Sequence, residues 1–256
     1  MTAAPSHTEV ALVTGSAKRI GATVTEALSR AGYGVVIHCH RSRDAAEALA
    51  ARLTAEGGRC AVAAADLEEA AAAAGLVTVA ASLLGPITLL VNSAAIFEPD
   101  DITDFDVALW DRHFAVNLRA PALLSQAFAH ALPDGHSGAI VNIVDQRVWK
   151  PTPRCFSYTL TKSALFTATR TMAQALAPRI RVNAVGPGPI FRSERQTPDD
   201  FRLQAAAVPL GHAVAPAEIA DAVLYLARAR SVTGQMIAVD GGQHLAWQTP
   251  DAVVAE

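Results

Sequence analysis

The stretch VALVTGSAKRIG, residues 10–21, decides the fold. A short apolar run, 10–13, leads through Thr14 and Gly15 into a segment, 18–31, that looks helical and stops at Gly32. A continuous apolar run is typical of a strand buried on both faces. A glycine-rich turn between such a strand and a helix lets the backbone approach a phosphate group. The stretch therefore predicts a strand–turn–helix unit that can hold a pyrophosphate; a tight turn without a ligand is the alternative.

The alternation of strand and helix continues along the chain. Further strands are predicted at 34–40, 60–67, 87–95, 138–144, 180–185 and 234–242. Helices are predicted at 42–58, in the alanine-rich segment before the fourth strand, and at 105–131, 155–177 and 216–228, with Pro121 expected to kink the long one. Buried strands that alternate with helices predict a parallel sheet covered on both faces. We therefore predict a Rossmann-like, doubly wound α/β fold of about seven strands, as a single domain over residues 1–256.

Composition excludes several classes of function. Hydrophobic residues make up 51% of the chain and the formal net charge is −3, so nothing favours nucleic acid or an anionic membrane as a partner. Cys39, Cys60 and Cys155 are widely spaced and form no CxxC pair, which is typical of reduced thiols and predicts no metal site. No apolar run approaches the roughly 20 residues of a membrane span, and the first residues lack the features of a signal peptide. We expect a cytoplasmic protein.

The end of the second predicted strand indicates which dinucleotide would bind. Proteins selective for NAD place a carboxylate there to hold the ribose 2′-hydroxyl. Here His40, Arg41 and Ser42 follow the strand, and Arg43 comes next. A carboxylate would repel a 2′-phosphate, whereas an arginine and a hydroxyl would bind it. The sequence therefore predicts NADPH rather than NADH; the alternative is that the arginines are solvated loop charges.

Tyr158 and Lys162 are four residues apart in a predicted helix, which places both side chains on one face. The reference pKa of tyrosine is about 10, so a tyrosine that exchanges protons near neutral pH needs help. A lysine ammonium one turn away stabilises the phenolate. We therefore predict an acid/base pair; the alternative is an ordinary surface pair.

With these residues in view, the chain resembles the short-chain dehydrogenase/reductases. The resemblance covers nearly the whole chain: the TGxxxRxG turn at 14–21, VNSAA at 91–95, Asn117 in the long helix, the YxxxK pair, RVNAVGPGPI at 181–190 and VDGG at 239–242. It implies that Tyr158 is the acid/base, that Lys162 lowers the pKa of Tyr158 and holds the nicotinamide ribose, and that Asn117 supports a proton-relay water. It also implies a homotetramer.

The cofactor-binding residues follow from the same resemblance. Asp66, after the third strand, could accept a hydrogen bond from the adenine amino group or cap the following helix. The family's usual NNAG is Asn92-Ser93-Ala94-Ala95 here, which narrows the space beside the nicotinamide. The predicted cofactor set is Gly15, Ser16, Lys18, Arg19, Ile20, Gly21, His40, Arg41, Ser42, Asp66, Leu67, Asn92, Ala94, Lys162, Pro187 and Gly188.

The fifth predicted strand runs directly into Asp145, where ketone-reducing members of the family have a serine. A carboxylate there would repel the negative charge that develops on a ketone oxygen. Reduction of a C=N bond instead puts hydride on carbon and a proton on nitrogen. Burial favours the protonated form of a carboxyl group, which could relay that proton, and an ionised one could accept N–H bonds from an amino-heterocycle. The alternative is a structural carboxylate paired with Arg147 or Arg154.

The pteridine reductases, including bacterial dihydromonapterin reductases, share this replacement, and TGSAKRIG and HCHRS resemble their sequences. The resemblance implies that Phe97 stacks a pterin against the nicotinamide and that Arg19 reaches the pterin or a cofactor phosphate. The predicted substrate residues are Arg19, Phe97, Asp145 and Tyr158. Loop packing is the alternative for Phe97, and a salt bridge that braces the turn is the alternative for Arg19. Ala95 stands where a serine is typical of this subgroup.

Two segments near the end of the chain complete the interpretation. Residues 186–210 are expected to form a mobile substrate loop, in which Arg192 and Arg195 either meet an acidic tail of the substrate or are solvated. Arg147 and Trp149 are expected at the pocket mouth, and Trp247, in the tail 243–256, could reach a neighbouring subunit.

The sequence therefore favours NADPH-dependent reduction of a pterin of the dihydromonapterin, dihydrobiopterin or dihydrofolate type. The alternatives are reduction of a non-pterin ketone or imine, and an NADPH sensor without turnover. A sensor would not need Tyr158, Lys162 and Asn117 together.

Overall fold

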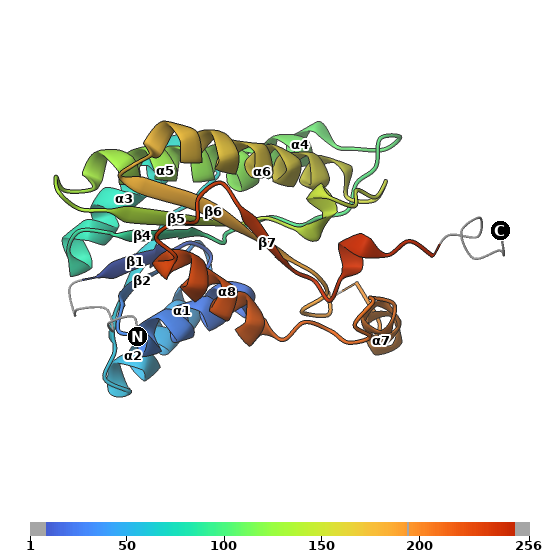
Figure 1. Ribbon diagram of the computed structural model, residues 1–256, viewed down its shortest axis with the longest axis horizontal. Helices are drawn as coiled ribbons and strands as arrows, with labels where there is room; N and C mark the ends of the chain where they lie inside the picture. The colour runs from blue at the N-terminus through green and yellow to red at the C-terminus, as the bar shows by residue number, and fades with distance from the viewer. Residues whose placement is uncertain (1–8, 194, 249–256) are drawn as a thin grey trace.

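A seven-stranded parallel sheet forms the centre of the computed structural model, which describes residues 9–193 and 195–248 (Figure 1). The strand order is β3-β2-β1-β4-β5-β6-β7. The chain builds outward from β1 to β3, then crosses back and builds outward from β4 to β7, which confirms the predicted doubly wound fold. The strands are β1 (Val10–Val13), β2 (Gly34–Cys39), β3 (Arg59–Ala64), β4 (Leu89–Asn92), β5 (Gly138–Ile143), β6 (Ile180–Pro187) and β7 (Met236–Val239).

Helices cover both faces of the sheet (Figure 1). One layer consists of α1 (Arg19–Arg30), α2 (Arg43–Ala55) and α8 (Pro216–Arg228), and the other of α3 (Ala70–Leu84), α5 (Ala120–Ala131) and α6 (Phe156–Leu176). Short 3₁₀ turns, η2 (Gln146–Val148) and η3 (Gln243–Leu245), follow β5 and β7. No helix among the described residues is both long and apolar enough to cross a membrane.

Successive residues of each central strand point into opposite cores, which explains why the strands are apolar throughout. Val13 and Ile37 belong to the core beneath α1, α2 and α8. Leu12, Val36 and Leu90 belong to the core beneath α3, α5 and α6. The order of strands reverses between β1 and β4, and in such sheets ligands bind beyond the carboxyl ends of the strands at that point.

The long helix predicted at 105–131 is present as a contiguous helical run over residues 107–131, and the irregularity expected at Pro121 lies just before it. Helix α4 (Val107–Phe114) is followed by a π-helical turn, η1 (Ala115–Arg119), and then by α5. Pro121 has no N–H to donate to the carbonyl of Asn117, its partner in a regular α-helix, which is the physical reason for an irregular turn here. The irregular turn therefore lies before the proline, at the residue predicted to support a relay water.

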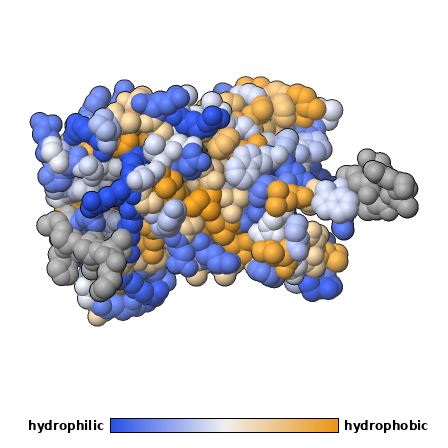
Figure 2. Space-filling view, in the orientation of Figure 1, coloured by the Kyte–Doolittle hydropathy of each residue, from blue (hydrophilic) through white to orange (hydrophobic). Residues whose placement is uncertain are grey.

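The substrate segment also differs from a plain loop. Residues 198–206 form helix α7 (Pro198–Ala206), which a capping box between Thr197 and Asp200 starts. Figure 2 shows apolar residues at the surface around α7. Leu203 of α7, Leu210 after it, and Leu245 and Trp247 after β7 are exposed. Residues 249–256 of the predicted tail lie outside the described residues.

Packing of the second core gives a stability prediction. The Phe128 ring is fully buried and fills the space above Gly138, where an added Cβ would lie 2.8 Å from the ring. Phe128→Ala should lower the free energy of unfolding by about 3–5 kcal/mol, measured by urea denaturation. Val79→Ala, at an exposed position of α3, is the matched control and should change it by about 0.5 kcal/mol or less. Similar losses in both variants would contradict the assigned packing.

Candidate active site

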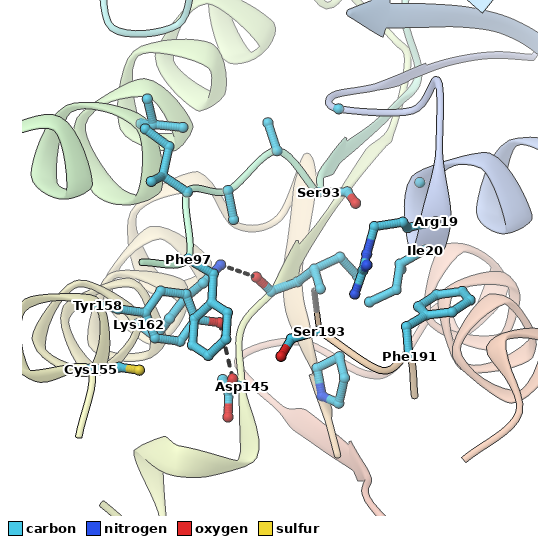
Figure 3. Close-up of a pocket in the computed structure, with 18 of the residues that line it drawn as sticks. Arg19, Ile20, Ser93, Phe97, Asp145, Cys155, Tyr158, Lys162, Phe191 and Ser193 are labelled. Atoms are coloured by element: carbon cyan, nitrogen blue, oxygen red, sulfur yellow. Dashed lines mark hydrogen bonds between the residues drawn. The ribbon is translucent and has the colours of Figure 1, made fainter. Parts of the chain in front are cut away.

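A pocket of about 810 Å³ lies along the carboxyl ends of the strands (Figure 3). It is lined by the turn after β1, the ends of β2 to β6, the first turns of α6 and residues 187–204. This volume is at the large end of the range for small-molecule sites. The pocket therefore has room for a ligand the size of a dinucleotide together with a second, smaller ligand.

The turn after β1 is closely packed and tied to the neighbouring strands. Gly15 has a φ of +62°, and a Cβ at Gly21 would lie 2.4 Å from the Gly15 carbonyl oxygen, so only glycine fits. The Gly15 N–H donates to Nδ1 of His38 at 3.0 Å, and Nε2 of His38 lies 3.1 Å from the Ala65 carbonyl. This pattern requires the neutral ring with its proton on Nε2. Burial lowers the pKa of His38 to about 4.

His38 was not singled out by the sequence analysis. It lies within an otherwise apolar strand, and a polar residue in a buried strand was the one available signal. By bonding Gly15 and Ala65 it joins the carboxyl ends of three adjacent strands, β1, β2 and β3, and so holds the turn in its glycine-dependent shape.

The arginines after β2 have different surroundings. Arg43 forms an ion pair with Glu47 at 2.8 Å and is committed to α2. Arg41 lines the pocket, and in the described ranges its side chain has no hydrogen bond or ion pair, as is also true of Lys18. Arg41 and Lys18 therefore remain available to a phosphate.

Asp66 is not the N-cap of α3, which is Glu69 and has no side-chain cap, so the capping alternative is wrong. The Asp66 side chain accepts from the Glu68 N–H at 2.9 Å in the turn before α3, and it lies 3.4 Å from Nε2 of His40. It also lines the pocket, so an acceptor oxygen is present where an adenine could approach.

Three predicted cofactor residues do not line the pocket. The Ser16 hydroxyl donates to the Val13 carbonyl at 2.7 Å, and the Asn92 amide donates to Oδ1 of Asn142 at 2.8 Å, so both side chains point into the protein. Ser42 precedes α2 without a side-chain cap. The predicted residues that do line it are Gly15, Lys18, Arg19, Ile20, Gly21, His40, Arg41, Asp66, Leu67, Ala94, Lys162, Pro187 and Gly188.

Tyr158 and Lys162 lie on one face of α6, and both are buried at the pocket wall (Figure 3). The Tyr158 hydroxyl donates to Oδ2 of Asp145 at 3.0 Å, and Nζ of Lys162 donates to the Ile143 carbonyl at 2.8 Å. Burial, followed by the charge of Asp145, raises the pKa of Tyr158 well above its ordinary value. Burial lowers the pKa of Lys162 to about 8. Tyr158 is therefore a protonated phenol in this arrangement.

Asp145 is surrounded by hydrogen-bond donors. Oδ1 accepts from the Arg147 backbone N–H at 2.8 Å, and Oδ2 accepts from Nη1 of Arg147 at 3.0 Å as well as from Tyr158. Two of these three donors belong to Arg147, whose guanidinium forms an ion pair with the Asp145 side chain. The structural pairing and the contact with Tyr158 thus occur together, and the partner is Arg147 rather than Arg154.

Asn117 lies behind the pocket wall rather than at its surface. Its side chain accepts from the Ile96 N–H at 2.8 Å and donates to the Ile96 carbonyl at 2.9 Å and to Thr161 at 3.3 Å. These bonds join the segment after β4 to α6. The role of Asn117 in a proton relay remains a prediction.

Phe97 covers Tyr158. The two ring centroids are 4.7 Å apart in an edge-to-face arrangement, and Phe97 is 37% exposed. The guanidinium of Arg147 lies 5.3 Å from the Phe97 ring and that of Arg195 lies 5.6 Å from it. Arg195 also forms an ion pair with Glu98 at 2.9 Å. Phe97 thus combines packing against the site with an exposed ring.

Arg19 and the segment after β6 meet across the cofactor end. The Arg19 guanidinium lies 4.9 Å from the Phe191 ring, and within the described part of the chain Arg19 forms no ion pair, so the bracing salt bridge is absent there. Ser93 of the VNSAA motif, Phe191 and Ser193 of the predicted substrate loop, and Cys155 also line the pocket, although none of them was predicted as a site residue (Figure 3).

Trp149 does not line the pocket, contrary to the expectation from sequence. Its ring packs 4.9 Å from that of His244, which lies in the segment after β7. Trp247 is exposed, and its contact with a neighbouring subunit remains a prediction.

Comparison with known proteins gives the family. A family model described as enoyl-(acyl carrier protein) reductase matches residues 15–244. The chain belongs to the short-chain dehydrogenase/reductase family. It is 53% identical to a solved structure of FolM alternative dihydrofolate reductase 1 from Brucella suis in complex with NADP, with a TM-score of 0.93 over 96% of this chain and 98% of that one.

Two curated relatives show the range within the family. Pteridine reductase 1 of Leishmania tarentolae is 35% identical, with 96% of this chain and 99% of that protein covered. L-xylulose reductase of Bos taurus is also 35% identical, with 91% of this chain and 95% of that protein covered. The family is therefore certain, whereas identity at this level does not separate a pterin from a sugar as substrate.

The buried His38 gives a pH prediction. In the unfolded chain its imidazole binds a proton below about pH 6.5, but in the folded protein only near pH 4, so acid favours the unfolded state between these values. This group should lower the free energy of unfolding by about 1.4 kcal/mol per pH unit on acidification. His38→Gln should lose that contribution, so its urea stability should fall less steeply from pH 6.5 to 4.5. Parallel curves for the two proteins would contradict the neutral His38.

Proposed function

We propose that this protein is an NADPH-dependent reductase of a pterin, which adds hydride to a ring carbon of a C=N bond. The contact between Tyr158 and Asp145 carries the proposal, because it puts a proton donor beside a carboxylate where a ketone reductase has a hydroxyl. The pteridine reductase and the dihydrofolate reductase named above support it.

The residues of the cofactor end fit a phosphorylated dinucleotide. A Cβ at Gly21 would clash with the Gly15 carbonyl and one at Gly188 would lie 2.5 Å from Cα of Asp240, so both glycines allow the chain to pack closely at the edge of the pocket. Arg41 and Lys18 would hold the 2′-phosphate and the pyrophosphate, and Lys162 would hold the nicotinamide ribose. When bound, NADPH supplies the hydride.

Tyr158 would supply the proton. Its raised pKa keeps the hydroxyl protonated over the physiological range, which suits the reductive direction. Asp145 accepts from that hydroxyl and so fixes the direction in which the Tyr158 oxygen presents itself to the pocket. An ionised Asp145 also has acceptor capacity left for an N–H group of an amino-heterocycle.

The substrate end of the pocket suits a flat heterocycle. Phe97 offers an exposed aromatic ring next to Tyr158, and Ala94 and Ala95 leave a small, apolar floor after β4. A flat ring with N–H donors would therefore find both a stacking surface and, at Asp145, an acceptor. The three pterin types remain equally compatible with these contacts.

A non-pterin ketone or imine is the second candidate, because the similarity to L-xylulose reductase is as high as that to the pteridine reductase. It predicts that Asp145→Ser is tolerated or even improves turnover. An NADPH sensor would bind the cofactor without oxidising it in the presence of any substrate, and it would not need Tyr158 hydrogen-bonded to a second ionisable group.

Substrate choice is tested by the rate of NADPH oxidation with dihydromonapterin, dihydrobiopterin and dihydrofolate beside several simple ketones. We expect turnover with the pterins alone, and its loss in Asp145→Ser.

Tyr158→Phe removes the proton donor and should lower kcat by about 10²- to 10⁴-fold. Turnover confined to the ketones would refute the pterin proposal, and no turnover with bound NADPH would favour the sensor.

Cofactor choice is tested with a matched pair of arginines. Arg41→Ala removes a guanidinium that is available to the 2′-phosphate and should raise the dissociation constant of NADPH about 10- to 100-fold, leaving that of NADH unchanged. Arg43→Ala, in which the lost guanidinium was already paired with Glu47, should leave both unchanged. Titration calorimetry measures both constants, and equal effects of the two variants would contradict the assignment.

A further inference from the structure

Arg147, two residues after Asp145, is poorly explained as part of the scaffold. Within the described ranges the polar side-chain contact of its guanidinium is with Asp145, at 3.0 Å, and its buried Nε–H has no acceptor. The guanidinium lies over Phe97, and Arg147 lines the pocket. A buried polar group without a partner is costly and calls for an explanation. The side chain is thus directed at the reactive groups rather than at a structural carbonyl.

The reaction itself creates a need for a cation here. When Tyr158 gives up its proton, a phenolate forms 3.0 Å from the Asp145 carboxylate. Two anions at such a distance cannot both ionise without compensation. An aspartate at this position therefore makes Tyr158 a weaker acid unless a positive charge lies beside the aspartate. A neutral serine at the same position would not require such a charge.

The other nearby cations do not meet this need equally well. Arg195 is paired with Glu98, so its charge is already balanced. Lys162 is bonded to the Ile143 carbonyl, and its lowered pKa of about 8 means that its charge fades in mild alkali. A guanidinium keeps its charge over the whole working range. Arg147 also acts in this sense on Tyr158, since its charge lowers the pKa of the phenol whereas that of Asp145 raises it.

We propose that Arg147 is the charge-compensating, positioning residue that makes Asp145 compatible with proton donation by Tyr158. Its guanidinium holds Asp145 as a carboxylate against the phenol and balances that charge as the phenolate forms. In the step concerned, the O–H bond of Tyr158 breaks and an N–H bond forms on the substrate. The new C–H bond takes its hydrogen and electron pair from the reduced nicotinamide. The inference rests on Tyr158 as proton donor, as proposed above, and not on the identity of the heterocycle.

A double-mutant cycle tests the inference. Arg147→Gln leaves the anion uncompensated and should lower kcat about 100-fold, with the NADPH dissociation constant within about threefold of wild type. Arg147→Lys keeps the charge and should remain within about tenfold of wild type. In Asp145→Asn/Arg147→Gln no anion is left to compensate, so the phenolate absorbance of Tyr158 should appear at lower pH than in Arg147→Gln alone. Melting temperatures of all variants separate lost folding from lost chemistry.

A structural brace would behave differently. Arg147→Lys and Arg147→Gln would then be equally impaired, and the Tyr158 phenolate would appear at the same pH in the double variant as in Arg147→Gln; either result would overturn the inference.

A second readout does not need turnover, so it separates failure of this inference from failure of the proposed function. The phenolate absorbance of Tyr158, taken as the difference from Tyr158→Phe, should appear at lower pH than in wild type in Asp145→Asn and at higher pH in Arg147→Gln. Unchanged onsets in both variants would contradict the inference even if the enzyme reduced pterins.

Discussion

The hydrogen bond from Tyr158 to Asp145 is the contact on which the rest of the site depends. It joins the end of β5 to the first turn of α6, two elements that the doubly wound sheet brings to the same edge. Arg147 forms an ion pair with Asp145, and the Phe97 ring packs against Tyr158. Lys162 lies one turn further along α6. The bond directs the phenol proton at the carboxylate, so the proposed donation to a substrate requires the O–H of Tyr158 to turn from Asp145 to the substrate nitrogen.

The two ends of the pocket perform separate tasks. At the cofactor end, glycines let the turn after β1 pack closely, and the charges of Lys18, Arg19 and Arg41 would attract phosphate. At the substrate end, Asp145 and Glu98 balance the charges of Arg147 and Arg195. Net positive charge is therefore concentrated where phosphates would bind, whereas the reacting groups lie in a region of paired charges.

Sequence reasoning succeeded where local spacing determines the outcome. The position of the glycine turn follows from the change from a strand pattern to a helix pattern, and the shared face of Tyr158 and Lys162 follows from the helical period. The position of Asp145 at the pocket follows because residues after a strand lie at the edge of the sheet. It failed where tertiary contacts decide. Whether a polar side chain at a strand end turns inward, as Asn92 does, or organises three strands, as His38 does, depends on neighbours distant in sequence. The pairing of Asp145 was left between two arginines for the same reason.

The most direct test of the account follows the hydride itself. NADPH carrying deuterium at the transferred position of nicotinamide C4 is incubated with the protein and a dihydropterin, and the product is analysed by NMR and mass spectrometry. The account predicts one deuterium on a ring carbon of the tetrahydropterin, with Tyr158→Phe slowing its appearance. A tetrahydropterin without deuterium, or deuterium recovered only in reduced ketones, would contradict it.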